Sequence, residues 1–125
     1  MDPTWIVVAV ESESDANRIR NYLESKGYSV DTASDAYHAI ALAGTHLYRA
    51  MLVDADMLLA GAEAVKRLSR VRGPQLRVIA VAANLSLSTR ATLNESGIDA
   101  ILAKPIDLHA LQQKLTQLLG RPAGM

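Results

Sequence analysis

The sequence predicts a doubly wound α/β domain built on a five-stranded parallel sheet. Five short apolar segments alternate with five helical segments along the chain, and the connections between them are short. Most of the apolar segments are continuous, which is typical of strands covered on both faces of a parallel sheet. We expect one domain over residues 1–120 and a disordered tail over residues 121–125.

The composition limits the classes of function. Half of the 125 residues are hydrophobic, only 4% are aromatic and none is Phe, so the core is expected to be aliphatic. The absence of cysteine excludes disulfides, thiolate metal sites and cysteine nucleophiles. Thirteen basic and thirteen acidic residues balance, and no basic stripe is interleaved with aromatics, so we expect no direct nucleic-acid binding. With neither a signal peptide nor an apolar run of transmembrane length, we expect a cytoplasmic protein without membrane contact.

The expected strands are rich in Val, Ile, Leu and Ala, which favour pleated, buried positions. They are residues 5–10, 28–33, 50–53, 76–82 and 100–103. The second strand alternates polar with apolar residues and is therefore expected to be more exposed than the others.

The expected helices have an apolar face, which is weak in the polar fourth helix, and most have a capping residue at the start and a glycine at the end. Ser12 with Asp15 matches a capping box for the first helix. The other expected helices begin at Ser34-Asp35, after a loop containing Gly61, at Ser86 or Ser88, and at Asp107. They end at or near Lys26-Gly27, Gly44, Gly73-Pro74, Gly97 and Gly120.

Asp54 is the first candidate for a functional residue. It directly follows the most buried expected strand, and ligand sites in open α/β sheets lie at the carboxyl ends of the strands. The alternative is that Asp54 only caps the next helix or opens a turn. Strands one, four and five end at Glu11, Ala82 and Lys104, which are therefore expected at the same edge of the sheet.

Two acids and a lysine at this edge suit phosphoryl chemistry. Glu11 and Asp54 could share Mg²⁺, which prefers carboxylates, water and phosphate oxygens. Lys104 could neutralise a phosphoryl oxygen, and the Asp54 carboxylate could act as a nucleophile to form an acyl phosphate. The alternative is a buried ion pair between Lys104 and Asp54 that only fixes the loops.

With these residues in place, the chain resembles a response-regulator receiver domain of the chemotaxis-regulator type along nearly its whole length. The resemblance lies in the strand that ends at Asp54, in Asp56-Met57, in Lys104-Pro105 and in the spacing of the five units. It implies a flavodoxin-like (βα)5 receiver fold and a signalling module rather than an enzyme. It implies that Asp54 accepts a phosphoryl group from a histidine kinase or a histidine phosphotransfer protein, and that Lys104 contacts this group, often before a cis peptide bond. It also implies Mg²⁺ held by Glu11, Asp54 and the backbone carbonyl of Asp56.

The sequence departs from the receiver pattern at several positions. Val10 stands where the family has the first of two adjacent acids, and Ala82 stands where the family has Thr or Ser. Ile101 replaces the aromatic switch residue, and Leu58 replaces a proline. The loop between Met57 and Glu63 looks about one residue short. We therefore expect weak binding of Mg²⁺ and weakened phosphorylation and switching.

Three functions remain open from the sequence. A working receiver would accept phosphate on Asp54 and switch the face made by the fourth helix, the fifth strand and the fifth helix, through which it could also form a homodimer. A pseudo-receiver would bind partner proteins without phosphate. A flavodoxin-like cofactor binder would need a Ser-, Thr- and Gly-rich loop after strand one, and the acidic residues 11–15, which lack glycine, disfavour it.

Overall fold

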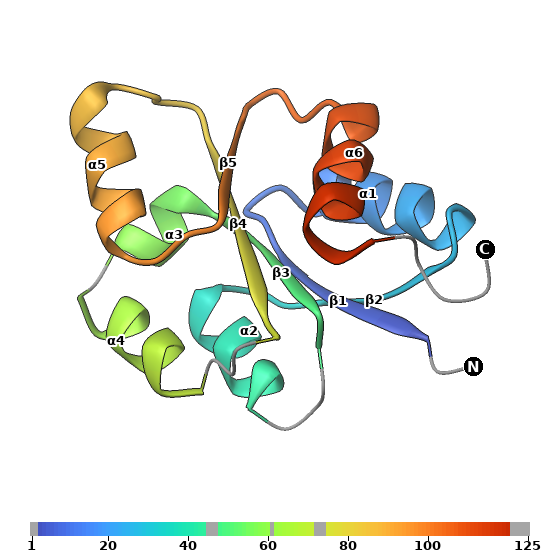
Figure 1. The fold of residues 1–125 in the computed structure, drawn as a ribbon, viewed down its shortest axis with the longest axis horizontal. Helices are drawn as coiled ribbons and strands as arrows, with labels where there is room; N and C mark the ends of the chain where they lie inside the picture. The colour runs from blue at the N-terminus through green and yellow to red at the C-terminus, as the bar shows by residue number, and fades with distance from the viewer. Residues whose placement is uncertain (1–2, 45–47, 61, 72–74, 121–125) are drawn as a thin grey trace.

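The computed structural model describes residues 3–44, 48–60, 62–71 and 75–120, which form a parallel sheet between two layers of helices (Figure 1). The sheet has the strand order β2-β1-β3-β4-β5. The strands are β1 (Thr4–Ala9), β2 (Tyr28–Thr32), β3 (Ala50–Asp54), β4 (Arg77–Ala82) and β5 (Ala100–Ala103). The helices are α1 (Glu13–Ser25), α2 (Ala36–Ala43), α3 (Ala55–Leu59), α4 (Ala62–Val71), α5 (Leu87–Glu95) and α6 (Leu108–Leu119). The predicted fold class is confirmed.

Alternate residues of the central strands supply two separate cores, one on each face of the sheet, as the twofold periodicity of a strand requires. On one face, Val8 and Leu52 join a cluster that contains Ile19 of α1 and Leu111 of α6. On the other face, the strands pack against α2, α3, α4 and α5. Figure 1 shows the same division, with α1 and α6 together on one side of the sheet.

β3 lies at the centre of the sheet and brings Asp54 to its carboxyl edge. All five of its residues are buried, and it pairs in parallel with β1 and with β4. In the register between β3 and β4, Asp54 lies opposite Val81. Because all strands run in one direction, the segments that follow β1, β3, β4 and β5 meet at this edge.

The predicted helix caps are confirmed where the structure describes them. The Asp15 N–H donates to Ser12 Oγ over 3.2 Å, and the His38 N–H donates to Asp35 Oδ1 over 2.8 Å. Asp107 accepts hydrogen bonds from two N–H groups at the start of α6. Of the two serines considered for α5, Ser86 is the cap.

One helix was not predicted. α3 begins directly after β3, in a segment expected to be a loop. Because it is only five residues long, it is too short to show the 3.6-residue periodicity of a helix. The loop glycine Gly61, the predicted break at Gly73-Pro74 and the expected tail at residues 121–125 lie outside the described residues. None of the described helices is long and apolar enough to cross a membrane.

Candidate functional site

Asp54 is a buried carboxylate with a hydrogen-bond donor at each oxygen. Its exposed fraction is 1%. Extended backbone at Asp54 makes it the N-cap of α3, and Oδ1 accepts a hydrogen bond of 3.1 Å from the Asp56 N–H. Oδ2 accepts one of 2.5 Å from Lys104 Nζ. Asp54 therefore caps α3, as the alternative interpretation expected, and it also lies at the carboxyl edge of the sheet.

Lys104 is held over this edge by the end of β5. Its backbone N–H donates to the Ala82 carbonyl over 3.0 Å, which ties the segment after β5 to the end of β4. The peptide bond to Pro105 is cis. The Lys104 side chain is 28% exposed at its ion pair with Asp54, so the pair is partly solvated.

The electrostatics around Lys104 bring in the other acids of the site. The hydrogen bond to Asp54 raises the pKa of Lys104 above its ordinary value of 10.5, and burial opposes the rise. The negative charges of Asp54, Asp56 and Glu11 also raise this pKa. Lys104 thus lies in the field of Glu11 and Asp54, the two acids that the sequence placed here, and of Asp56.

Glu11 and Val10 follow β1 and differ in environment. Glu11 is exposed. Val10 is only 6% exposed and belongs to the core beneath α1 and α6. An apolar side chain therefore occupies the position at which the receiver pattern has an acid.

The donors present fit Mg²⁺ in their chemistry. Glu11 and Asp54 offer hard carboxylate oxygens, and Mg²⁺ needs only one or two carboxylates if water and phosphate complete its shell. No group of three or more acidic, His or Cys side chains suited to a metal occurs among the residues the structure describes. Asp56 lies within α3, where N–H groups point toward the N-terminus of the helix and carbonyls point away from it. The structure thus places the Asp56 N–H at Asp54, and the ligand role of its carbonyl stays a prediction.

The two predicted switch positions are apolar and packed. Ala82, the last residue of β4, is 4% exposed and lies opposite Ala103 of β5. Ile101 is half-buried and packs against the core on the side of α2 to α5. Neither side chain can donate or accept a hydrogen bond, so phosphate at Asp54 would have no hydroxyl partner at Ala82.

The topology brings Asp54 and Lys104 into contact and places Glu11, Asp56 and Ala82 around them. Sequence reasoning missed the part that the Asp56 N–H plays at Asp54. The available signal was the spacing of the two acids, because an Asp side chain often accepts a hydrogen bond from the N–H two residues on. It also missed the hydrogen bond of 3.3 Å from the Arg18 guanidinium to the Ile106 carbonyl, which ties α1 to the segment after Lys104.

Comparisons with known proteins agree with this architecture. CheY4, a chemotaxis protein of Vibrio cholerae, superimposes with a TM-score of 0.82 at 21% identity, covering 94% of this chain and all of CheY4. The receiver domain of the sensor histidine kinase PA1611 from Pseudomonas aeruginosa, solved with magnesium coordinated in its active-site cleft, gives 0.80 at 24% identity, covering 95% of this chain and 99% of that one. At these identities the likeness shows the fold.

Sequence matches identify the family. The transcriptional regulatory protein TctD of Salmonella typhimurium is 31% identical over 120 residues, which are 95% of this chain and 53% of TctD. The chain thus spans about half the length of TctD and of the similarly matched response regulator MprA of Mycobacterium. The family model for the response regulator receiver domain matches residues 6–116. The chain therefore belongs to the response regulator receiver domains, the signalling modules of two-component systems, which are not enzymes.

Proposed function

We propose that this receiver domain, over residues 1–120, accepts a phosphoryl group on Asp54 from a histidine of a partner protein, with weakened chemistry and switching. The observation that carries the proposal is the contact between Asp54 and Lys104 at the carboxyl end of the central strand. This contact supports the proposal because the carboxylate can act as the nucleophile, and the neighbouring cation can neutralise charge on the phosphoryl oxygens.

The chemistry assigns one task to each residue. An Asp54 oxygen attacks phosphorus, an O–P bond forms, and the N–P bond to the donor histidine breaks with the electron pair leaving on the imidazole nitrogen. Lys104 moves from the carboxylate to a phosphoryl oxygen as a point charge. Mg²⁺, when bound, would neutralise negative charge on the phosphoryl oxygens. Glu11 and Asp54 would hold it, with the Asp56 carbonyl as the further ligand expected from the sequence.

Three positions support the weakened chemistry. Val10 lowers the negative charge available to the metal by one, because it replaces an acid of the receiver pattern. Ala82 leaves a phosphoryl oxygen without a hydroxyl partner, and a hydrogen bond to a charged group is worth roughly 1.5–3 kcal/mol. Ile101 offers no aromatic ring that could follow such a hydroxyl. We expect binding of Mg²⁺ to be correspondingly weak.

One observation favours a second function, that of a pseudo-receiver that binds partners without phosphate. Both Asp54 oxygens are satisfied inside the chain, by Lys104 and by the Asp56 N–H. A buried carboxylate with its partners in place needs no ligand to be stable. Phosphorylation would first have to break the ion pair with Lys104.

Mass spectrometry after incubation with acetyl phosphate and Mg²⁺ separates the two functions. The first predicts a single added phosphoryl group, which the Asp54→Asn variant does not acquire because the amide is not a nucleophile. Asp56→Asn is the matched control, since that exposed acid lies two residues away, and it should still be labelled. Labelling of Asp54→Asn at the wild-type level would refute the assignment, and no labelling of the wild type by acetyl phosphate or by a cognate histidine donor would favour the pseudo-receiver.

The partners follow from the same proposal. The phosphoryl donor is a histidine kinase or a histidine phosphotransfer protein. A second copy of the chain is a further candidate at the face formed by α5, β5 and α6, the fourth helix, fifth strand and fifth helix of the sequence-based count. The cytoplasmic location expected from the sequence stays a prediction.

A further inference from the structure

A basic, apolar-floored groove lies between α2 and α4, on the sheet face opposite to α1 and α6. It has a volume of about 220 Å³. Ile40, Ala41, Gly44 and Val71 contribute apolar surface or backbone to it. Tyr37, Arg67 and Arg70 complete the lining. This volume is below the ~300–1,000 Å³ of sites for drug-sized ligands, so the groove suits the side chains of a docked peptide.

The groove contains exposed apolar side chains that a partner could cover. Tyr37 is 40% exposed and Val71 is 38% exposed, and both belong to the four exposed large hydrophobic residues of the described chain. They lie on different helices and line the same groove. Large apolar side chains gathered in one hollow and rimmed by charge are typical of an interaction site.

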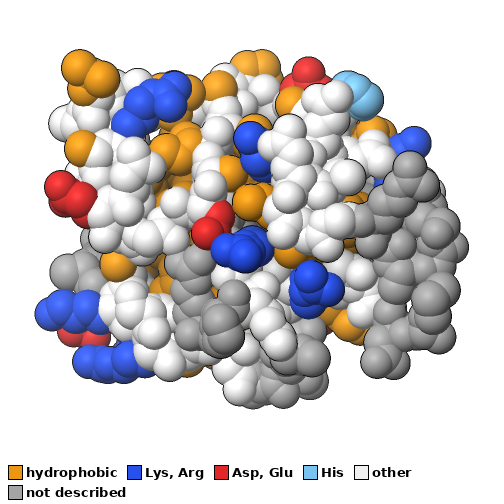
Figure 2. Space-filling model, viewed as in Figure 1, with side chains coloured by type: hydrophobic (Ala, Val, Ile, Leu, Met, Phe, Trp, Pro, Cys, Tyr) orange, Lys and Arg blue, Asp and Glu red, His pale blue; other side chains and the backbone are white. Residues whose placement is uncertain are grey.

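The charge around the groove selects the partner. Arg67 lies over the Tyr37 ring, with its guanidinium carbon 5.3 Å from the ring centroid. An arginine stacked in this way keeps its N–H edges for a carboxylate. Within the described part of the chain, neither Arg67 nor Arg70 forms an ion pair. Lys66 adds a third cation to α4, against the single acid Glu63. In Figure 2, Lys and Arg side chains gather at the lower left, where Figure 1 places α4.

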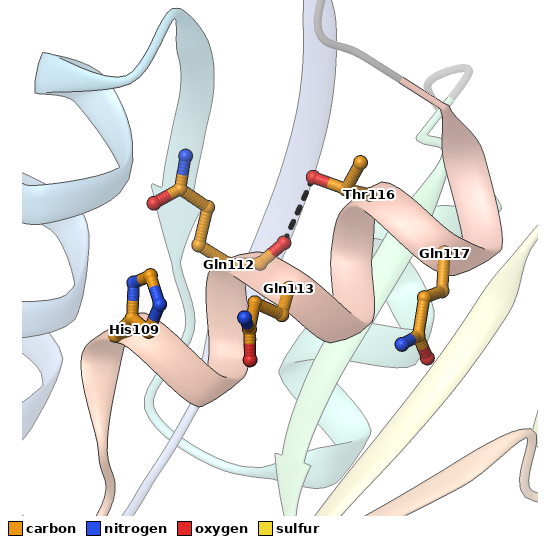
Figure 3. Close-up of a pocket in the computed structure, with 5 residues that line it drawn as sticks. All are labelled: His109, Gln112, Gln113, Thr116 and Gln117. Atoms are coloured by element: carbon orange, nitrogen blue, oxygen red, sulfur yellow. Dashed lines mark hydrogen bonds between the residues drawn. The ribbon is translucent and has the colours of Figure 1, made fainter.

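A second hollow on the described part of the chain lacks this selectivity. It measures about 410 Å³ and lies along α6, where His109, Gln112, Gln113, Thr116 and Gln117 line it (Figure 3). All five side chains come from one helix, and Thr116 Oγ1 already donates to the Gln112 carbonyl over 3.0 Å. No Lys, Arg, Asp or Glu is among them, so no charge favours one class of partner there.

We propose that the groove between α2 and α4 binds an acidic amphipathic segment of a partner protein. One apolar side chain of that segment occupies the hollow over Ile40 and Gly44, and carboxylates on either side of it bind Arg67 and Arg70. Asp54 is not among the residues that line this groove, and the proposed use of the groove does not depend on phosphorylation.

Substitution of Gly44 can be used to test whether the groove is occupied. Its φ of −79° and ψ of −14° are ordinary helical values, so other residues can adopt this conformation. A Cβ added there would lie 3.6 Å from Val71 Cγ1, an ordinary van der Waals contact across the groove. Gly44→Ala therefore fits without a clash, whereas Gly44→Leu extends into the space that the partner's side chain would occupy.

The test uses a fluorescein-labelled twelve-residue peptide with leucines one helical turn apart among glutamates, and anisotropy at low salt reads binding. A peptide with Gln in place of Glu is the control. We expect saturable binding of the Glu peptide, about tenfold or more tighter than that of the Gln peptide, and weaker in 500 mM salt. Amide shifts in NMR spectra should concentrate on α2 and α4.

Variants locate the binding surface. Arg67→Glu/Arg70→Glu and Gly44→Leu should each weaken binding about tenfold or more, while Gly44→Ala and Arg90→Glu on α5 should change it less than about twofold. The arginine variant leaves the core unaltered, so it remains informative if Gly44→Leu does not fold. Equal binding of the Gln peptide, unchanged affinity in the arginine variant or shifts confined to α5 and α6 would refute the proposal. Self-association that the arginine variant abolishes, without binding of the Glu peptide, would assign the groove to a second copy and also refute it.

Discussion

At the scale of single residues, Asp54 could be predicted because its position has two independent signals. It ends a continuous apolar segment, and Lys104 ends another in the same sheet. Parallel strands bring their carboxyl ends together, so the contact between Asp54 and Lys104 follows from topology. The orientation of the Asp56 peptide could not be predicted, because it depends on whether a turn or a helix follows Asp54 and the sequence supports either.

The ion pair makes stability depend on pH in a defined direction. Asp54 holds the pKa of Lys104 above 10.5, so the stabilisation is complete below pH 10.5 and is lost as pH rises through the raised value. Lys104→Met should lower the free energy of unfolding at neutral pH by roughly 1–3 kcal/mol, since the buried Asp54 loses its cation while the pair is partly solvated. Urea unfolding at a series of pH values measures both effects.

Comparing wild type with Lys104→Met isolates the contribution of Lys104 to the pH dependence of stability. Burial also raises the pKa of Tyr28 and of Tyr48, and these groups lower the stability of both proteins above pH 10. The difference in unfolding free energy between wild type and Lys104→Met should therefore shrink above pH 10.5. A difference that stays constant to pH 12 would show that the pair does not contribute as described.

Val10 allows the weakened metal site to be tested by restoring an acid. Val10→Asp adds a carboxylate beside Glu11, and Mg²⁺ affinity depends on carboxylate charge. We expect binding to tighten about tenfold or more, a gain of roughly 1.4 kcal/mol. Without metal the variant should be less stable than wild type, because three carboxylates crowd the edge and a buried apolar side chain is lost from the core.

Calorimetric titration with Mg²⁺ measures this change, and Val10→Asn is the matched control. The amide has nearly the shape of the carboxylate without its charge, so Val10→Asn should lower stability without increasing the affinity for Mg²⁺. Equal Mg²⁺ affinities of wild type and Val10→Asp, or tight binding by the wild type, would mean that Val10 does not line the metal site.

At the scale of helices and strands, periodicity and capping predicted the elements that are long enough to show them. α1 and α6 have an apolar stripe and a capping side chain, and their buried residues are those of the stripe. α3 has neither sufficient length nor a distinctive cap, since its cap is the candidate functional residue itself. The bounds of the strands differ from the predicted ones by at most one residue at either end, as expected where the last pairing depends on neighbours that a single sequence does not specify.

The element formed by α5 and β5 should respond weakly to a phosphoryl analogue. Ala82 offers no hydroxyl to the bound group, and Ile101 is already packed against the core. We therefore expect only small amide chemical-shift changes on α5 and β5 when beryllofluoride and Mg²⁺ are added. Ala82→Thr should enlarge these changes by restoring the hydroxyl. Large changes across α5 and β5 in the wild type would contradict the weakened switch.

At the scale of the whole molecule, the alternation of strands and helices was sufficient to predict the architecture. Right-handed connections between parallel strands leave few arrangements for five units, and the second strand, which was predicted to be more exposed, lies at an edge of the sheet. Surfaces were less predictable. The groove between α2 and α4 is lined by residues about thirty positions apart whose exposure depends on how closely the helices approach, which the sequence does not contain.

The face formed by α5, β5 and α6 should be where the phosphoryl donor or a second copy docks. Leu87, in the first turn of α5, is 87% exposed, although a Leu gains about 1.5–3 kcal/mol when it is fully buried. Arg90, one turn further along, is exposed and donates through Nε to the Leu85 carbonyl over 3.3 Å. An apolar anchor with a neighbouring cation is suited to an interface, and nothing in the core requires either side chain.

Charge reversal at Arg90 tests this face. Arg90→Glu should weaken binding of the histidine donor, or self-association, about tenfold if the charge faces the partner, and mainly by slowing association. Sedimentation and surface plasmon resonance measure the two cases. Arg67→Glu/Arg70→Glu, in the groove between α2 and α4, is the matched control and should leave this binding unchanged. Binding that survives Arg90→Glu and is lost in the α4 variant would move the docking surface for these partners to the groove between α2 and α4.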